Sequence, residues 1–235
     1  MANLAQLKIL EDLNGVLLVD KPSGIAFATV VKAVKRKFGL VKVGHGGSLD
    51  ALASGLFVLL VGDANKFADR VMGADRAYEG TVRFGLKTDT GDVYGRAETT
   101  GPVGDGLSAK LAAALPEFRG DVFQVEPRFC SIRKEGTAAY EIADTGDHTP
   151  FLAHVYRFDV ADDGAFALRA SKGVIPRVLV RDLGDAVGCG ASLAALRRTR
   201  VGAFDVKDAI PFDRLLETEM KDFASCVIPL SQASL

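Results

Sequence analysis

Short apolar runs separated by glycine-rich turns dominate the first part of the chain. Residues 15–19 form an apolar run that ends at the turn sequence Asp20-Lys21-Pro22-Ser23-Gly24, and residues 56–61 form a second run. Both are typical of buried strands. Between them, apolar residues recur at helical spacing over 29–38 with lysines opposite. This spacing predicts an amphipathic helix with a basic outer face.

The rest of the chain mixes strand and helix patterns. The expected strands are 78–84, 154–160 and 165–170, the last two joined by the hairpin turn Asp162-Asp163-Gly164; the expected helices are 108–118, 178–187 and 192–198. We expect a loop at 88–95, and a terminal helix with an extended tail over 212–235. Intermixed elements with several hairpins favour an α+β fold, with a central mixed, mostly antiparallel sheet flanked by helices.

Composition narrows the class of protein. The 235 residues are 48% hydrophobic and 25% charged, which is ordinary for a globular chain. No apolar run approaches the roughly 20 residues that span a bilayer, and the first residues do not resemble a secretion signal. Cys130, Cys189 and Cys226 are irregularly spaced, which argues against a disulfide framework or a zinc site. We therefore expect a cytoplasmic protein that does not bind membranes.

Positive charge is local rather than global. The formal net charge is −1, but basic residues gather in two clusters. The first cluster contains Lys32, Lys35, Arg36, Lys37 and Lys42, and the second contains Arg197, Arg198 and Arg200. Each could bind a nucleic-acid backbone, or could be a solvated helix face.

One carboxylate stands at the end of a glycine-rich loop. Asp50 follows Gly44-His45-Gly46-Gly47 and precedes the apolar run at 56–61. An aspartate in this position either caps a turn or is a positioned catalytic group. Asp89 and Asp92 lack the full ligand series and closing glutamate of a calcium loop, so we interpret them as turn formers.

The segment 44–55 resembles the GHTGTLDPLATG motif of TruB-type tRNA pseudouridine synthases. It matches at Gly44, His45, Gly47, Leu49, Asp50, Leu52, Ala53 and Gly55. Four further segments extend the resemblance over about residues 15 to 204. They are 15–24; Tyr78 with Gly85 and the Thr88-Asp89-Thr90 segment; Gly136, Tyr140, Glu141, Ala143 and Gly146; and Ser171-Lys172-Gly173 with Arg177, Leu179, 182–184, 188–190 and 196–199.

The resemblance implies a fold, an activity and an organisation. It implies a pseudouridine-synthase core that forms one catalytic domain over 1–235, with an RNA-gripping thumb inserted at 125–153. Because the chain stops near Leu235, we expect no C-terminal PUA domain. The implied substrate is uridine 55 in the T-arm of tRNA. Neither a metal nor a cofactor is needed by that chemistry. We expect a monomer whose partner is tRNA, with no protein partner implied.

The resemblance also assigns roles to residues. Asp50 would be the nucleophile, Tyr78 would stack on the flipped uracil, and Arg177 would pair with Asp50. His45 would support the space left by the extracted base, and Leu179 would press on the base edge. The remaining substrate-binding candidates are Lys21, Lys172, Gly44 and Gly47.

Each of these residues also has a structural interpretation. Tyr78 and Leu179 could be core residues, Arg177 could belong to a structural salt bridge, and Lys21 or Lys172 could hold loops rather than meet phosphates. The chain also departs from the family at Ile175, Pro176 and Asp144; Pro176 removes a backbone donor next to Arg177, and Asp144 replaces an arginine that would grip RNA. The alternatives are therefore a non-catalytic RNA-binding or RNA-folding protein on the same fold, and a synthase that acts on another RNA.

Overall fold

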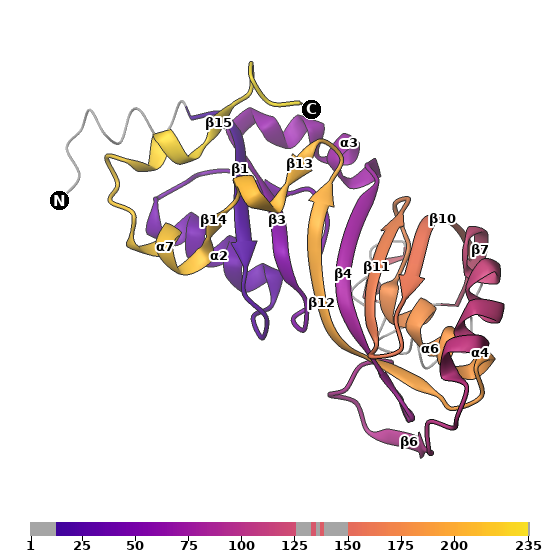
Figure 1. Cartoon of the computed structure of the whole chain (residues 1–235). Coiled ribbons are helices and arrows are strands. Elements are labelled where there is room, and N and C mark those ends of the chain that lie inside the picture. The colour runs from indigo at the N-terminus through magenta and orange to yellow at the C-terminus, as the bar shows by residue number, and fades with distance from the viewer. Residues whose placement is uncertain (1–12, 126–132, 135–136, 139–149, 235) are drawn as a thin grey trace. The chain divides into compact units, whose positions relative to one another are not determined.

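The computed structural model describes residues 13–125, 133–134, 137–138 and 150–234 (Figure 1). The chain divides into two compact units. Unit 1 is formed by Met1–Arg76 and Arg197–Leu235, and unit 2 by Ala77–Leu196.

Unit 1 is built on two antiparallel strands, β1 (Gly15–Lys21) and β3 (Ser54–Val61). Its other elements are α2 (Phe27–Lys37), β2 (Val43–His45), η1 (Gly62–Phe67), α3 (Ala68–Gly73), β13 (Phe204–Asp205), η4 (Val206–Asp208), β14 (Ile210–Pro211), α7 (Phe212–Glu217), η5 (Phe223–Cys226) and β15 (Ile228–Pro229). β14 pairs parallel to β1, while β15 pairs antiparallel to it. The C-terminal tail expected from the sequence therefore adds a strand to β1.

The core of unit 1 follows directly from its two apolar runs. The register places Val16 opposite Leu60 and Leu18 opposite Val58, and all four side chains are buried. Because alternate residues point to opposite faces, fully apolar runs such as these must be covered on both sides. On one face they pack with Phe204 and neighbouring apolar residues. The first apolar runs of the sequence are thus confirmed as buried strands.

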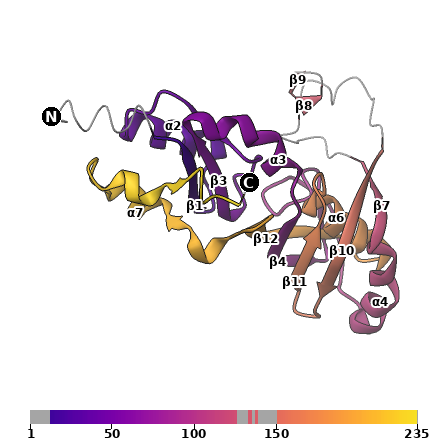
Figure 2. The same cartoon turned by 90° about the horizontal axis from the view of Figure 1, so that it is seen from above.

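Unit 2 contains the strand order β12-β4-β11-β10-β7. These strands are β4 (Arg76–Phe84), β7 (Gly120–Gln124), β10 (Phe151–Val160), β11 (Ala165–Ala170) and β12 (Ala191–Val201), and β12 continues by sequence into unit 1. The remaining elements are β5 (Leu86–Thr88), β6 (Ala97–Thr100), α4 (Leu107–Ala114), η2 (Leu115–Phe118), β8 (Arg133–Lys134), β9 (Thr137–Ala138) and α6 (Pro176–Ala186). Figure 2 shows α4 next to β7, and α6 close to β10 and β11.

These two units confirm the α+β class with a mixed, mostly antiparallel sheet. The hairpin of β10 and β11 closes at Gly164, whose φ of 86° is the left-handed conformation that such a turn favours. The helix expected at 178–187 begins two residues earlier, at Pro176. Within the described ranges, no helix is both long and apolar enough to cross a bilayer.

One local prediction was wrong. Residues 192–198 are not a helix: they belong to the strand β12, which pairs in parallel with β3 through Arg197 and Arg198. Leucine, alanine and arginine favour helices, but pairing with a buried strand overrides that preference. The backbone donor that Pro176 removes is not needed, because Pro176 is the first residue of α6, where an N–H has no partner within the helix.

Candidate active site

Asp50 lies half-buried in the loop between β2 and β3. At the start of the loop, the Gly46 N–H donates to the carbonyl oxygen of Val58 across 2.9 Å. After Asp50, the Ala53 N–H donates to the carbonyl oxygen of Asp50 across 3.1 Å, which closes a backbone turn over residues 50–53. The backbone that carries Asp50 is therefore fixed on both sides.

The turn that follows β1 holds the same loop from a second direction. The hydroxyl of Ser23 donates to the carbonyl oxygen of Leu52 across 2.6 Å. The N–H of Gly24 donates to the carbonyl oxygen of Ala51 across 2.7 Å. The turn at 20–24 thus holds the two residues that directly follow Asp50.

Lys21 is completely buried beneath this turn. Its ammonium group donates to the carbonyl oxygens of Pro22 at 2.9 Å, Ile25 at 2.7 Å and Ala51 at 3.4 Å. Burial lowers the pKa of Lys21 to about 8; the negative charge of Asp50 opposes that shift, and Arg198 adds to it. Of the two roles considered for Lys21, the structure shows the loop-holding one.

Arg198 is a second buried cation beside the loop. Only 2% of the residue is exposed. Its Nη1 donates to the carbonyl oxygen of Ser48 and its Nε to that of Leu56, both at 2.8 Å. Arg198 therefore joins β3 to the backbone two residues before Asp50.

The second basic cluster is consequently not an open basic surface. Besides the buried Arg198, Arg197 forms a two-pronged ion pair with Asp20, with N–O distances of 2.9 and 2.7 Å. Arg200 is more exposed and lies 3.9 Å from the carboxylate of Asp205. Of the two alternatives for this cluster, the solvated helix face is wrong, because the three arginines lie on the strand β12.

His45 packs against two aromatic rings that also lie close to each other, with 6.1 Å between the centroids of Phe27 and Phe57. Its ring centroid lies 5.2 Å from that of Phe27 and 5.9 Å from that of Phe57. Burial and the nearby charge of Arg198 lower the pKa of His45. The Gly47 N–H donates to Nδ1 across 3.2 Å, which leaves the proton of the neutral ring on Nε2. A neutral, packed ring fits a space-filling role better than acid–base work.

The glycines of the loop permit close packing. A Cβ on Gly44 would lie 1.9 Å from Oδ1 of Asn65, which is far inside contact distance. Gly47 has a φ of 119°, a left-handed conformation that side-chain-bearing residues rarely adopt. The side chain of Asn65 is itself held in place, because its Nδ2 donates to the carbonyl oxygens of Leu60 and Gly62. Both glycine positions are therefore required by the local fold.

Arg177 forms the centre of a second cluster, in unit 2. It lies in the first turn of α6, and its side chain is 7% exposed. Nη1 donates to the carbonyl oxygen of Thr90 at 3.0 Å and to Oδ2 of Asp92 at 3.4 Å. The guanidinium group is thus positioned by the 88–95 loop.

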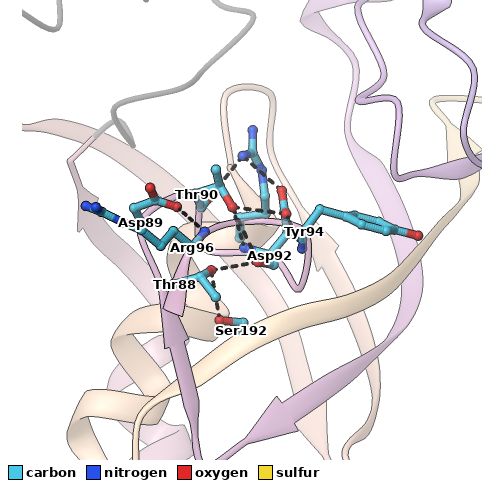
Figure 3. A network of polar contacts seen from close by, with 8 residues as sticks. Thr88, Asp89, Thr90, Asp92, Tyr94, Arg96 and Ser192 are labelled. Carbon is cyan, nitrogen blue, oxygen red and sulfur yellow. Dashed lines mark hydrogen bonds and ion pairs between the residues drawn. The ribbon is translucent and has the colours of Figure 1, made fainter. Parts of the chain in front are cut away.

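The loop around Asp92 is a connected polar network (Figure 3). Oδ1 of Asp92 accepts hydrogen bonds from the Thr90 hydroxyl and the Tyr94 N–H, both at 3.0 Å. The hydroxyl of Thr88 donates to the carbonyl oxygen of Asp92 at 2.6 Å and lies 3.1 Å from that of Ser192. Asp92 is therefore a turn former, as expected, and also an ion-pair partner of Arg177. This second role could not be predicted from the sequence, because the two residues are 85 positions apart.

The other candidates of unit 2 differ in exposure. Tyr78 in β4 and Leu179 in α6 are buried, at 6% and 2% exposure, as their structural interpretation required. Lys172 is exposed in the turn after β11, where the Ser171 hydroxyl donates to its carbonyl oxygen. The candidates therefore divide between unit 1, which contains Asp50, and unit 2, which contains Arg177.

The first basic cluster is an exposed face of α2. Val30 and Val34 of this helix are buried, while Lys32, Lys35, Arg36 and Lys37 are exposed, as is Lys42 in the following loop. Three of these side chains lie in the last turn of the helix, where positive charge is favourable. This helix and its basic outer face are as the sequence predicted.

Most of the expected thumb lies outside the described residues. This holds for Gly136, Tyr140, Glu141, Ala143, Asp144 and Gly146. Of residues 125–153, the structure describes Val125, the paired strands β8 and β9, and residues 150–153. Among the described residues, no group of three or more His, Cys, Asp or Glu side chains is arranged to hold a metal ion.

Comparison with solved structures defines the class of fold. The chain aligns with the crystal structure of a Cbf5-Nop10-Gar1 complex with a TM-score of 0.73 and 23% identity, covering 97% of this chain and 63% of that chain. The structure of an H/ACA RNP bound to a substrate RNA containing 2'-deoxyuridine gives a TM-score of 0.69 and 22% identity, covering 96% of this chain and 62% of that chain. The chain therefore shares the fold of these two solved structures.

Sequence comparison then gives the family. Residues 35–162 match the N-terminal domain of the TruB family pseudouridylate synthases, and residues 177–233 match the tRNA pseudouridylate synthase B C-terminal domain. The chain is 36% identical over 231 residues to tRNA pseudouridine synthase B of Opitutus terrae, covering 95% of this chain and 96% of that protein. It is 42% identical over 215 residues to the protein of the same name from Gluconacetobacter diazotrophicus, covering 88% of this chain and 70% of that protein. The chain belongs to the TruB family, and it is an isomerase.

Proposed function

We propose that this protein converts uridine to pseudouridine in tRNA, at uridine 55 of the T-arm, with Asp50 as the nucleophile. The family match and the name shared by its relatives support a tRNA substrate. The observation that carries the assignment of Asp50 is the construction of its loop. Two buried cations, Lys21 and Arg198, and a turn from another strand hold the backbone on both sides of one half-buried carboxylate.

The reaction places specific demands on such a group. The glycosidic N1–C1′ bond of uridine breaks, the uracil turns, and a C5–C1′ bond forms; the proton on C5 leaves and N1 gains one, so no other reactant is needed. A carboxylate nucleophile divides this difficult exchange into easier steps. Because the target base lies in folded RNA, it must first be extracted, at a cost of a few kcal/mol. Holding the nucleophile rigidly lowers the barrier of the later steps.

Arg177 and Tyr78 act on the same uridine in this proposal. The aromatic ring of Tyr78 stacks on the uracil, a contact worth about 1–3 kcal/mol. Asp92 and the Thr90 carbonyl orient Arg177, so its charge is already placed before RNA binds. The pairing of Arg177 with Asp50, the contact of Leu179 with the base edge and the phosphate contact of Lys172 remain proposals that follow from the family resemblance.

The exposed basic face of α2 is the proposed contact to the RNA backbone. Four basic side chains of the helix, together with Lys42, point to solvent. Such a face binds phosphates regardless of the RNA sequence. Its affinity for RNA falls as the salt concentration rises, because the release of counterions from the RNA then contributes less to binding. We also propose that the protein acts as a monomer in the cytoplasm and needs no protein partner.

The substrate assignment is tested with a T-arm hairpin RNA. Wild-type protein should form pseudouridine at position 55, detected by chemical mapping, and should leave a hairpin with cytidine at that position unmodified. Modification at a different uridine would move the proposal to another target site. RNA binding without any product would contradict the enzyme and favour the non-catalytic RNA-binding protein.

A further inference from the structure

Tyr94 presents an aromatic ring to solvent beside the Arg177 cluster. The residue is 78% exposed, the highest value for an aromatic residue in the part of the chain that the structure describes. Within that part, its ring takes part in none of the aromatic or cation–π contacts. Figure 3 shows the ring extending away from the polar network that carries it. Within the described residues, no aromatic or cation–π contact therefore explains why an aromatic side chain stands at this position.

The backbone under this ring is nevertheless tightly fixed. The Tyr94 N–H donates to Oδ1 of Asp92, the same carboxylate whose Oδ2 meets Arg177. The preceding residue, Val93, donates its N–H to the carbonyl oxygen of Leu193 across 3.0 Å. A Cβ on the following residue, Gly95, would lie 2.2 Å from the Thr90 hydroxyl, so the loop closes tightly there too. The ring is thus exposed but held on a rigid support.

We infer that Tyr94 is a second stacking residue, which binds the base of a nucleotide neighbouring the target uridine in the substrate RNA. This inference rests on the proposed function. The backbone N of Tyr94 lies 3.0 Å from Oδ1 of Asp92, so the ring is carried on backbone directly beside the Asp92–Arg177 pair. A ring on a fixed backbone has little freedom left to lose on binding, since a tyrosine has only two side-chain torsions.

The physical benefit comes from base extraction. When a uridine leaves its stack, the neighbouring base loses a stacking partner, which contributes to the cost of extraction. An aromatic side chain offers a replacement surface for any base, because every base has a π-face. Tyr94 therefore strengthens binding of the opened RNA without taking part in bond changes.

The absence of tryptophan from the chain allows a direct test. In Tyr94→Trp the protein carries one indole at the proposed stacking position. Its fluorescence should be quenched when the T-arm hairpin binds, because nucleobases quench a stacked indole. The matched control is Phe123→Trp, which places the indole at another exposed aromatic position of unit 2, 73% exposed in the wild type. Equal quenching in both variants, or none in Tyr94→Trp while the RNA binds, would overturn the inference.

Kinetics give the second arm of the test. Tyr94→Ala should raise the KM for the hairpin about 5- to 100-fold with little change in kcat, because uniform binding is lost. Tyr94→Phe should restore the wild-type KM, and Phe123→Ala should not alter it. An unchanged KM in Tyr94→Ala with active wild-type protein would refute the role of Tyr94 alone. Failure of the wild type to modify the hairpin would instead overturn the proposed function, and this inference with it.

Discussion

Arg198 donates a hydrogen bond from Nη1 to the carbonyl oxygen of Ser48, two residues before Asp50. The same side chain also donates to the carbonyl oxygen of Leu56. These contacts make a buried arginine of strand β12 part of the support for the proposed nucleophile. They also explain why a charge that the sequence placed on a surface is found in the interior.

Replacing Arg198 should therefore lower the stability of the fold. In Arg198→Met, two carbonyl groups lose their buried donor, which should lower the free energy of unfolding by about 2–4 kcal/mol. Chemical denaturation measures this loss. The control is Arg200→Met on the same strand; its side chain is 57% exposed, so a change within about 0.5 kcal/mol is expected. Similar losses in both variants would contradict the role given to Arg198.

The ion pair between Arg177 and Asp92 predicts a change in activity. Asp92→Asn retains an oxygen that can accept the Tyr94 N–H but removes the negative charge beside a nearly buried guanidinium. Since truncating one partner of such a pair is costly, kcat should fall by at least about tenfold. The control is Asp89→Asn in the same loop, whose oxygen can still accept the Arg96 N–H. If the two variants kept equal, near-wild-type kcat values, the ion pair would have no part in orienting Arg177.

Lys21 predicts a pH dependence of stability. Its pKa is about 8 in the folded protein and about 10.4 when unfolded, so between these values the unfolded chain binds more protons. The contribution of Lys21 therefore makes the folded state more stable as pH rises from about 8 to 10.4, by at most about 1.4 kcal/mol per pH unit. Measuring the free energy of unfolding across this range in wild type and Lys21→Arg isolates the effect, because arginine stays charged. Parallel curves would contradict the lowered pKa.

The basic face of α2 predicts the salt dependence of RNA binding. Each lysine that neutralises a phosphate contributes about 0.7–0.9 to the slope of log affinity against log salt. The double variant Lys32→Ala/Lys35→Ala should therefore reduce that slope by about 1.5, as measured by filter binding over a salt series. Lys110→Ala, which removes an exposed lysine of α4, should leave the slope unchanged. An unaltered slope in the double variant would mean that the RNA backbone does not contact the basic face of α2.

Much of the fold could be predicted because its signals are local. The apolar runs of β1 and β3, the hairpin around Gly164 and the amphipathic pattern of α2 can each be recognised within a few residues. β12 could not, because its leucine, alanine and arginine residues favour a helix, and only the partner strand, far away in the sequence, makes them extended.

In the candidate site too, features signalled by adjacent residues could be predicted, and features that depend on distant residues could not. A motif of adjacent residues pointed to Asp50, and proline at position 176 is in hindsight a start signal for α6. The burial of Lys21 and Arg198 could not be predicted, since lysine and arginine are rarely buried unless partners arrive from other parts of the chain. The link between Asp92 and Arg177 likewise depends on a contact that only folding creates.

The most direct test of the account is to map pseudouridine in the T-arm hairpin after incubation with wild-type protein and with Asp50→Asn. Asp63→Asn is the control, because it removes a negative charge from an exposed position of the same unit. We expect pseudouridine with the wild type and Asp63→Asn, and none with Asp50→Asn, although that variant still binds the RNA. Product formation by Asp50→Asn at the wild-type rate would contradict the assignment of Asp50 as the nucleophile.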